Sequence, residues 1–399
     1  MNLRFDIKSN VRIPELDGLR GLAILSVVFY HYIASGFAPP GGLLDRFIRN
    51  VFPLTWTGVD LFFVLSGFLI GGILMDCRNT ENYFRTFYLR RVCRIFPLYF
   101  LWLSLFFILP WLFAPRFPPD WYRTVFSEQI PRFPQWGYFF FLQNFYVAQT
   151  TLFGPFWMAP TWSLAIEEQF YLLLPLMIWL VPVRKLPGTL IALILLVPAL
   201  RVYFYLYHPA LFTYVLLPCR ADTLLLGVLC DCLVRQERSR CWLEKRRGQL
   251  HLALVVLLLG AGGLTVLSKQ QTNPVFFNSF ELATFGYTWL AMLYACLLLG
   301  VVIAQKGLIA GVMRLRWLRQ LGTIAYGVYI THVSILYLTY GLILGKEPEI
   351  KDALDVVVTA VAFLTTLLIA AISWRFLEKP IIGWGHSFSY TKMNIRTAQ

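Results

Sequence analysis

The amino-acid sequence predicts an all-α integral membrane protein with about ten transmembrane helices, one short re-entrant or interfacial segment and both termini in the cytoplasm. Of its 399 residues, 58% are hydrophobic and only 14% are charged, whereas a soluble domain carries about 25% charged residues. Apolar runs of about 20 residues, the length that crosses a bilayer, recur along the whole chain. This composition excludes a soluble enzyme, a disordered chain and a disulfide scaffold.

Hydropathy windows of about 19 residues define the expected spans. In chain order they are 17–37, 56–76, 95–114, 161–182, 187–207, 213–234, 249–268, 284–305, 321–344 and 353–376. The segment 136–149 is apolar and aromatic but contains Gln143 and Asn144. Because this segment is only about 14 residues long, we interpret it as a re-entrant or interfacial piece.

The distribution of basic residues sets the predicted orientation. With ten spans and both termini inside, the inner segments hold most of the lysines and arginines, most densely at 235–247. Treating 136–149 as a full span would move that segment outside, against the positive-inside rule. The net charge of +14 is therefore explained by topology, and we expect no nucleic-acid partner.

A single membrane domain is expected over residues 14–380, between a cytoplasmic N-terminal segment, 1–13, and a cytoplasmic C-terminal tail, 381–399. The first apolar run carries Arg20 in its first turn and lacks the short apolar core and cleavage site of a signal peptide. We therefore expect this run to remain as the first helix of a multi-pass protein of the inner (plasma) membrane.

The cysteines and histidines give no sign of a disulfide framework or a metal centre. The seven cysteines lie mostly in predicted spans or on the inner side, without a C-x-x-C pair. The five histidines are too scattered for recognisable metal-ligand spacing. We therefore expect no metal.

Ionisable side chains inside spans point to function, because each costs roughly 2.5–3.5 kcal/mol at the bilayer centre. Arg20 and His31 in the first span are separated by a rotation of about 20° and a rise of about 16 Å along a helix. They share one face, with Arg20 at the cytoplasmic edge and His31 in the outer half. The alternative is an arginine that reaches lipid headgroups and a histidine that bonds a neighbouring helix.

Two carboxylates lie near the outer ends of other spans. Asp60 is about one turn into the second span and needs a cationic or histidine partner. Glu167, one turn after Ser163 in the fourth span, lies roughly 9 Å into the helix, close to the depth expected of His31. The alternative for Glu167 is a structural ion pair with Arg220 or Arg201.

An arginine cluster precedes the third span on the inner side. Arg90, Arg91 and Arg94 follow an i, i+1, i+4 pattern that puts Arg90 and Arg94 on one helical face. Guanidinium groups suit phosphate oxygens, although lipid headgroups are an equally good partner. In the ninth span, His332 is as readily a buried core histidine as a catalytic one.

These segments together resemble the membrane-bound acyltransferase-3 family of bacterial integral membrane O-acyltransferases. The resemblance runs from residue 14 to residue 380 in the order of the family. It is carried by Pro14-Glu-Leu-Asp17-Gly-Leu-Arg20, Gly58-Val-Asp60, Arg90-Arg91-Val-Cys-Arg94, Trp162-Ser163-Leu-Ala-Ile-Glu167-Glu168, Cys219-Arg220-Ala-Asp222, Tyr326-Gly-Val-Tyr329-Ile-Thr-His332 and Phe376-Leu-Glu378-Lys379-Pro380.

The resemblance implies that an acyl group, usually acetyl, moves from cytoplasmic acyl-CoA to a hydroxyl of a cell-envelope or exported glycan. His31 becomes the catalytic base, oriented by Glu167 or Asp60, with Glu167 favoured by depth. The implied donor-binding residues are Arg20, Arg90, Arg91 and Arg94, and the implied substrate-binding residues are Trp162, Ser163, Arg220 and Asp222.

Two alternatives remain open at this point. Intramembrane charges and glycines also mark the substrate pathways of transporters, so a flippase for a lipid-linked sugar is a rival. The same acyl transfer to a secondary metabolite or a lipid would need the same chemistry. The outer loops 38–55 and 115–160 are rich in aromatic residues that suit either sugar stacking or an interface belt.

Overall fold

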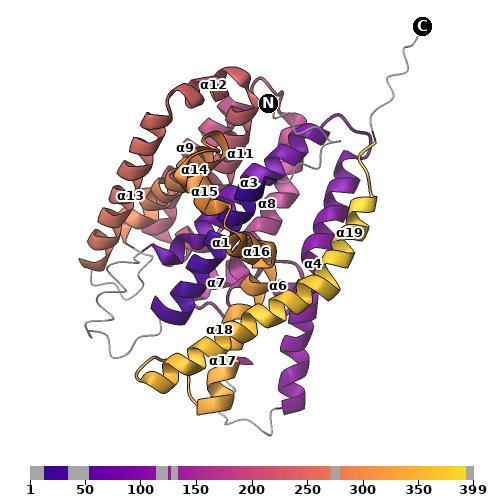
Figure 1. Ribbon diagram of the computed structural model, residues 1–399, viewed down its shortest axis with the longest axis vertical. Helices are drawn as coiled ribbons and strands as arrows, with labels where there is room; N and C mark the ends of the chain where they lie inside the picture. Colours follow the sequence, from indigo (N-terminus) through magenta and orange to yellow (C-terminus); the bar gives the residue numbers. More distant parts are fainter. Residues whose placement is uncertain (1–12, 35–53, 114–124, 127–133, 271–278, 392–399) are drawn as a thin grey trace.

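A computed structural model of the chain describes residues 13–34, 54–113, 125–126, 134–270 and 279–391. These residues form a helical bundle without a β-sheet (Figure 1). Within them, nine helices are long and apolar enough to cross a membrane. They are Pro14–Ala34, Thr55–Cys77, Tyr83–Trp111, Thr161–Leu180, Leu186–Tyr207, Arg247–Thr265, Leu282–Ile303, Ala325–Leu344 and Ala353–Ser387. The expected multi-pass membrane protein is confirmed.

The helices that matter below carry the labels of Figure 1. They are α1 (Pro14–Phe29), α3 (Gly58–Cys77), α4 (Tyr83–Phe113), α8 (Thr161–Leu180), α9 (Leu186–Tyr207), α11 (Leu217–Arg235), α12 (Glu237–Lys245), α13 (Arg247–Gln270), α14 (Tyr287–Ile303), α15 (Leu308–Met313), α16 (Arg316–Thr323), α17 (Ala325–Leu344), α18 (Ala353–Ser373) and α19 (Lys379–Ser387). Three π-helical turns interrupt or extend them at Tyr30–Ala34, Leu282–Gly286 and Trp374–Glu378.

The tenth expected span, 213–234, is a short helix, α10 (Phe212–Val215), followed by α11. By apolarity α11 does not qualify as a span, because it contains Arg220, Asp222 and Asp231, which are all buried. It packs against α3, α9 and α14 inside the bundle. The tenth helix is therefore present, but neighbouring protein rather than lipid surrounds its charges.

Other boundaries also differ from expectation. Helix α4 begins at Tyr83, so the arginine cluster lies inside this helix rather than before it. The last span continues through a π-helical turn into α19, which passes beside α4 (Figure 1). Residues 381–387 of the expected tail are thus helical. Asn82 Nδ2 donates to the Ser389 carbonyl at 2.8 Å and fastens the segment that follows.

The segment expected to be re-entrant or interfacial forms two short helices, α6 (Trp136–Phe139) and α7 (Gln143–Thr150), and neither is long enough to cross a bilayer. Gln143 and Asn144 are buried and tie this segment to the start of α8 and to α10. Gln143 Nε2 donates to the Thr161 carbonyl at 2.9 Å, and Asn144 Nδ2 donates to the Val215 carbonyl at 3.1 Å.

Glycines allow two helix pairs to approach closely. A Cβ added at Gly67 of α3 would lie 1.9 Å from the Leu224 carbonyl oxygen, and one at Gly227 of α11 would lie 2.1 Å from that of Val64. Gly21 of α1 meets the backbone of α16 in the same way. Small residues at helix crossings are the usual device for packing inside a membrane.

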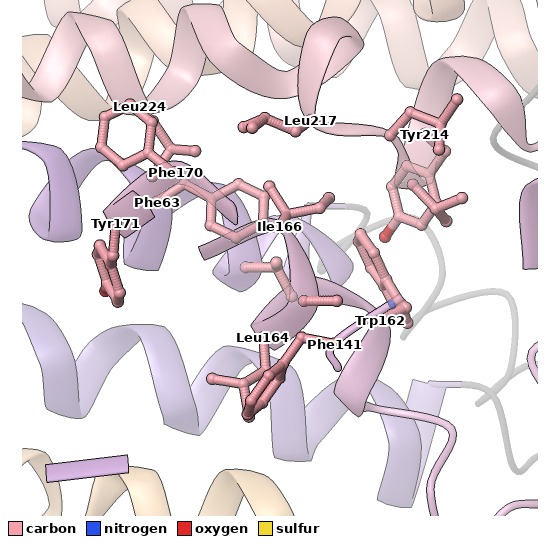
Figure 2. Packing of buried hydrophobic residues seen from close by; sticks show 14 of the residues in the cluster. Phe63, Phe141, Trp162, Leu164, Ile166, Phe170, Tyr171, Tyr214, Leu217 and Leu224 are labelled. Carbon is pink, nitrogen blue, oxygen red and sulfur yellow. The ribbon is translucent and has the colours of Figure 1, made fainter. Parts of the chain in front are cut away.

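Apolar side chains fill the space beside the α3–α11 crossing. Figure 2 shows Phe63 of α3, Ile166 and Phe170 of α8, and Leu217 and Leu224 of α11 packed in one buried cluster. This cluster ties α8 to the α3–α11 pair. It thereby fixes the position of α8, which carries Ser163 and Glu167.

Three arginines neutralise the acidic groups around α11. Arg220 forms a buried ion pair with Asp60 of α3. Arg201 of α9 donates to Asp222 at 2.9 Å and also to the Thr284 and Cys219 carbonyls. At the end of α11, Arg235 pairs with Asp76 at 2.5 Å. A buried charge without its partner costs several kcal/mol, so these pairs are conditions for the helix packing.

The Asp60–Arg220 pair gives a stability prediction. Asp60→Asn or Arg220→Met alone should lower the free energy of unfolding by about 3–5 kcal/mol, because each leaves one buried charge uncompensated. The double variant should be less destabilised than the sum of the two. Thermal unfolding of the purified chain in detergent measures this, with Lys351→Met at the exposed Lys351–Glu349 pair as the neutral control. Strictly additive losses would contradict a coupled pair.

Candidate active site

Two neighbouring cavities lie between the helices, and α1, α3, α8 and α17 contribute to both. We call the first the arginine cavity. It measures about 220 Å³, and its polar lining is Arg20, Ser66, Arg91, Arg94, Ser163, Glu167, Tyr171, Tyr326 and Tyr329. We call the second the histidine cavity. It measures about 340 Å³ and is lined by His31 and a set of aromatic side chains.

Three guanidinium groups from two helices meet in the arginine cavity. Arg20 of α1 pairs with Asp17 at 3.2 Å, and its side chain remains 37% exposed. Arg94 of α4 lies 3.8 Å from Glu378, and Arg91 lies over the ring of Tyr171 at 5.8 Å. The sequence-predicted Arg20, Arg91 and Arg94 are thus brought together although they come from distant parts of the chain.

Arg90, the fourth predicted donor residue, is used at a different place. Its Nε and Nη2 donate to the Phe388 carbonyl at 3.0 and 2.7 Å, and its guanidinium lies 4.9 Å from the ring of Tyr390. Arg90 therefore joins α4 to the segment that follows α19. The guanidinium of Arg90 thus bonds to the main chain and anchors this segment.

Glu167 lines the arginine cavity and not the histidine cavity. It accepts a hydrogen bond from the Tyr171 hydroxyl at 3.2 Å, and that hydroxyl lies 2.6 Å from Ser66 Oγ. The carboxylate thus lies among the arginines. Trp162, one and a half turns earlier on α8, lines the histidine cavity, so α8 carries residues of both.

The histidine cavity is largely aromatic. Trp162 and Tyr214 have ring centroids 4.6 Å apart, and Phe156 and Tyr337 stack at 4.1 Å. Tyr30, Trp56, Phe153 and Tyr329 complete the aromatic lining. Flat rings around one polar side chain suit a ligand with both an apolar face and hydroxyl groups. Of the expected outer loops 38–55 and 115–160, residues 38–53, 115–124 and 127–133 lie outside the described residues.

His31 lies in the π-helical turn that ends the first span, a local geometry often found at functional sites. Its Nδ1 is 3.0 Å from the Val27 carbonyl oxygen and 3.3 Å from Nε2 of His332 on α17. The two rings are 4.9 Å apart and inclined by 67°. Of the two carboxylates expected to orient His31, Asp60 is paired with Arg220 and Glu167 lines the other cavity. The pairing of His31 with a carboxylate stays a prediction.

Val59 and Tyr329 belong to the lining of both cavities and form the wall between them. The Tyr329 hydroxyl donates to the Pro160 carbonyl at 3.0 Å and lies 2.5 Å from Ser163 Oγ. Ser163, a predicted substrate-binding residue, thus holds this wall. Sequence reasoning did not assign Tyr329 or His332, although both lie in one segment of the ninth span.

The remaining predicted residues, Arg220 and Asp222, are buried in the ion pairs of α11. Arg220 also lies over the ring of Tyr287 at 4.4 Å. Their contacts hold helices together. Among the residues that the structure describes, no group of three or more His, Cys, Asp and Glu side chains could hold a metal ion.

The chain is similar in sequence to a known family and to several curated proteins. Residues 13–375 match the family described as acyltransferase domain. The putative peptidoglycan O-acetyltransferase YrhL of Bacillus subtilis is 29% identical over 398 residues, covering 94% of this chain and 56% of that protein. The peptidoglycan O-acetyltransferase OatA of Listeria monocytogenes is 27% identical over 388 residues, covering 92% of this chain and 56% of that protein.

The O-acetyltransferase OatA of Staphylococcus aureus is 26% identical over 392 residues and is matched over 57% of its length. The chain thus spans just over half the length of these curated relatives. No solved structure matches it. Because the family match covers nearly the whole chain, this protein belongs to the membrane-bound acyltransferase-3 family.

Proposed function

We propose that this protein is an integral membrane O-acyltransferase that moves an acyl group, most simply acetyl, from acyl-CoA to a hydroxyl of a cell-envelope glycan. The observation that carries the proposal is the adjacency of the two cavities across Val59 and Tyr329. A cationic site and a histidine in an aromatic site, separated by one layer of side chains, are what a transfer between a phosphorylated donor and a sugar acceptor requires.

The arginine cavity suits the donor. Guanidinium groups bind phosphate oxygens with two parallel hydrogen bonds, and Arg20, Arg91 and Arg94 face one space. Coenzyme A is larger than this cavity, so its nucleotide would lie at the opening while the pantetheine arm extends along α1 towards His31. Glu167 would lie beside that arm, and Arg90 would hold the C-terminal segment next to the opening.

The histidine cavity suits the acceptor. Sugars present apolar faces that stack on aromatic rings, and the lining is rich in such rings. The related proteins from Bacillus and Listeria are named for acetyl transfer to peptidoglycan. We therefore propose a peptidoglycan-type glycan as the acceptor, bound near Trp162 and His31.

The proposed reaction needs one base. The acceptor hydroxyl oxygen attacks the thioester carbonyl carbon while its proton passes to the neutral imidazole of His31. The tetrahedral intermediate then collapses, the carbon–sulfur bond breaks, and the departing thiolate takes the proton from His31. An ester and free coenzyme A result, and the histidine returns to its neutral state.

The charge distribution supports a cytoplasmic opening for the donor. From Val59 in the wall, α3 runs past Ile73, which lines the arginine cavity, to Asp76 near its C-terminal end. Asp76 pairs with Arg235. Arg235 begins the basic segment 235–247, which includes α12. Basic segments of this density stay in the cytoplasm, so the arginine cavity would open on that side.

His31→Ala should abolish transfer while leaving a folded protein. Loss of a general base typically costs roughly 10²- to 10⁴-fold in rate. Membranes that contain the variant are incubated with radiolabelled acetyl-CoA and soluble peptidoglycan fragments, and the labelled glycan is counted. Full transfer by a variant purified at wild-type yield would refute the role of His31. If the wild type binds the glycan but never transfers label, a transporter becomes the better hypothesis.

Arg91→Gln and Arg94→Gln should each raise the KM for acetyl-CoA about tenfold or more, since a hydrogen bond to a charged group is worth about 1.5–3 kcal/mol. The kcat should change less than the KM. Arg375→Gln, which replaces an exposed arginine in the last π-helical turn, is the matched control. An unchanged donor KM in both test variants would favour binding of lipid headgroups by these arginines.

The orientation can be measured on the native chain. All seven cysteines are free, and Cys241 in α12 is the exposed one. A membrane-impermeant maleimide should therefore label inside-out vesicles but not intact cells, and Cys241→Ser should remove that label. Labelling of Cys241 in intact cells would place α12, and with it the arginine cavity, on the outer side.

A further inference from the structure

We propose that His332 is a positioning residue that fixes the tautomer of His31. This inference rests on the proposed function, because it assigns His332 a part in the same transfer. His332 is fully buried on α17, and its Nε2 lies 3.3 Å from Nδ1 of His31. The two residues are 301 positions apart in the chain, so the contact is made by the packing of α17 against α1.

Two main-chain carbonyls determine where the protons are. Nδ1 of His31 is 3.0 Å from the Val27 carbonyl oxygen, and Nδ1 of His332 is 2.7 Å from that of Tyr329. A carbonyl oxygen only accepts hydrogen bonds, so each contact requires a proton on Nδ1. In neutral rings this puts the lone pair of both histidines on Nε2.

The contact between the rings follows from this assignment. Nε2 of His332 carries a lone pair and therefore accepts the Nδ1 hydrogen of His31, which is shared with the Val27 carbonyl. Nε2 of His31 is then the basic nitrogen. In a serine hydrolase triad a carboxylate imposes the same tautomer on the catalytic histidine. Here a neutral imidazole, itself anchored to a carbonyl, has that position.

The arrangement also helps when His31 becomes charged. Once Nε2 of His31 has taken the proton of the acceptor, the ring is a cation and its Nδ1 hydrogen becomes a stronger donor. The hydrogen bond to His332 is then charge-assisted and shorter. His332 remains neutral because its Nε2 lone pair accepts the His31 hydrogen and takes up no second proton, while its Nδ1 hydrogen stays on the Tyr329 carbonyl. No buried carboxylate is needed at this point.

Tyr329 connects this pair to the wall between the cavities. Its carbonyl holds His332, and its hydroxyl is held by Pro160 and lies against Ser163. The same residue therefore fixes both the histidine pair and the passage towards it. A change at Tyr329 would therefore disturb both the histidine pair and the wall between the cavities.

The tautomers can be measured without any assay of activity. The other histidines, His208, His251 and His386, are replaced by asparagine, so that only the pair remains in the full chain. Two-bond ¹⁵N–¹H correlation spectra of the ¹⁵N-histidine-labelled protein in detergent then report which ring nitrogen is protonated. Both rings should be protonated at Nδ1. A main population of His31 protonated at Nε2 would overturn the proposal, whether or not His31 is the catalytic base.

Two substitutions separate a positioning role from simple packing. The amide oxygen of His332→Gln can reach the place of Nε2 and accept from His31, whereas His332→Asn keeps a donor near the Tyr329 carbonyl and loses the contact with His31. We expect His332→Asn to lower kcat about 10- to 100-fold, with the donor KM unchanged. His332→Gln should keep most of the turnover with acetyl-CoA and peptidoglycan fragments.

The outcomes distinguish the two hypotheses. Equal turnover in the two variants, with the His31 tautomer unchanged in His332→Asn, would refute the positioning role of His332. Wild-type activity in His31→Ala would instead refute the proposed function, and the spectra would still decide the tautomer. If a His332 variant fails to fold, the spectra of the chain that retains both histidines still show whether His31 is protonated at Nδ1, as the proposal requires.

Discussion

The pairing of charges around α11 is the constraint on which the rest of the structure depends. A helix that carries Arg220, Asp222 and Asp231 is too polar to face lipid, and it is buried because Asp60, Arg201 and Arg235 neutralise it. These contacts, with the glycine crossing of α3 and α11, fix α3 at the centre of the bundle. Since α3 lines both cavities, the ion pairs determine where those cavities lie.

One cavity is cationic and the other is aromatic, because the helices that line them carry different side chains at the two cavities. At one level α1 and α4 supply guanidinium groups, and at the other the π-helical turn Tyr30–Ala34 supplies the imidazole of His31, which contacts His332 of α17. Val59 and Tyr329 line both cavities, and the hydroxyl of Tyr329 is tethered to α8 and the residue before it. A transferred acyl group would therefore have to pass a wall of side chains rather than a layer of backbone. Side-chain rotation is fast compared with helix movement, which makes such a passage compatible with a rigid bundle.

Much of the fold was predictable from the sequence because hydropathy and charge act locally. The apolar runs and the short segment 136–149 follow from such patterns, whereas the grouping of Arg20 with Arg91 and Arg94 was implied by the resemblance to the family. Depth in the membrane and the partners of buried side chains did not follow from such patterns. Glu167 was expected at the level of His31, yet α8 places it with the arginines. The contact between His31 and His332 depends on how α1 and α17 pack, and the engagement of Asp60 by Arg220 depends on the α3–α11 crossing. No local pattern records either of these tertiary contacts.

A structure of the chain with a stable donor analogue tests the central claim most directly. A ketone analogue of acetyl-CoA, in which a methylene group replaces the thioester sulfur, would be bound to the purified protein and imaged in a lipid nanodisc. The account predicts phosphate oxygens within hydrogen-bond distance of Arg91 or Arg94 and the acetyl carbonyl beyond Tyr329, beside His31. An analogue whose phosphates lie in the histidine cavity, or whose acetyl group ends among the arginines, would contradict it.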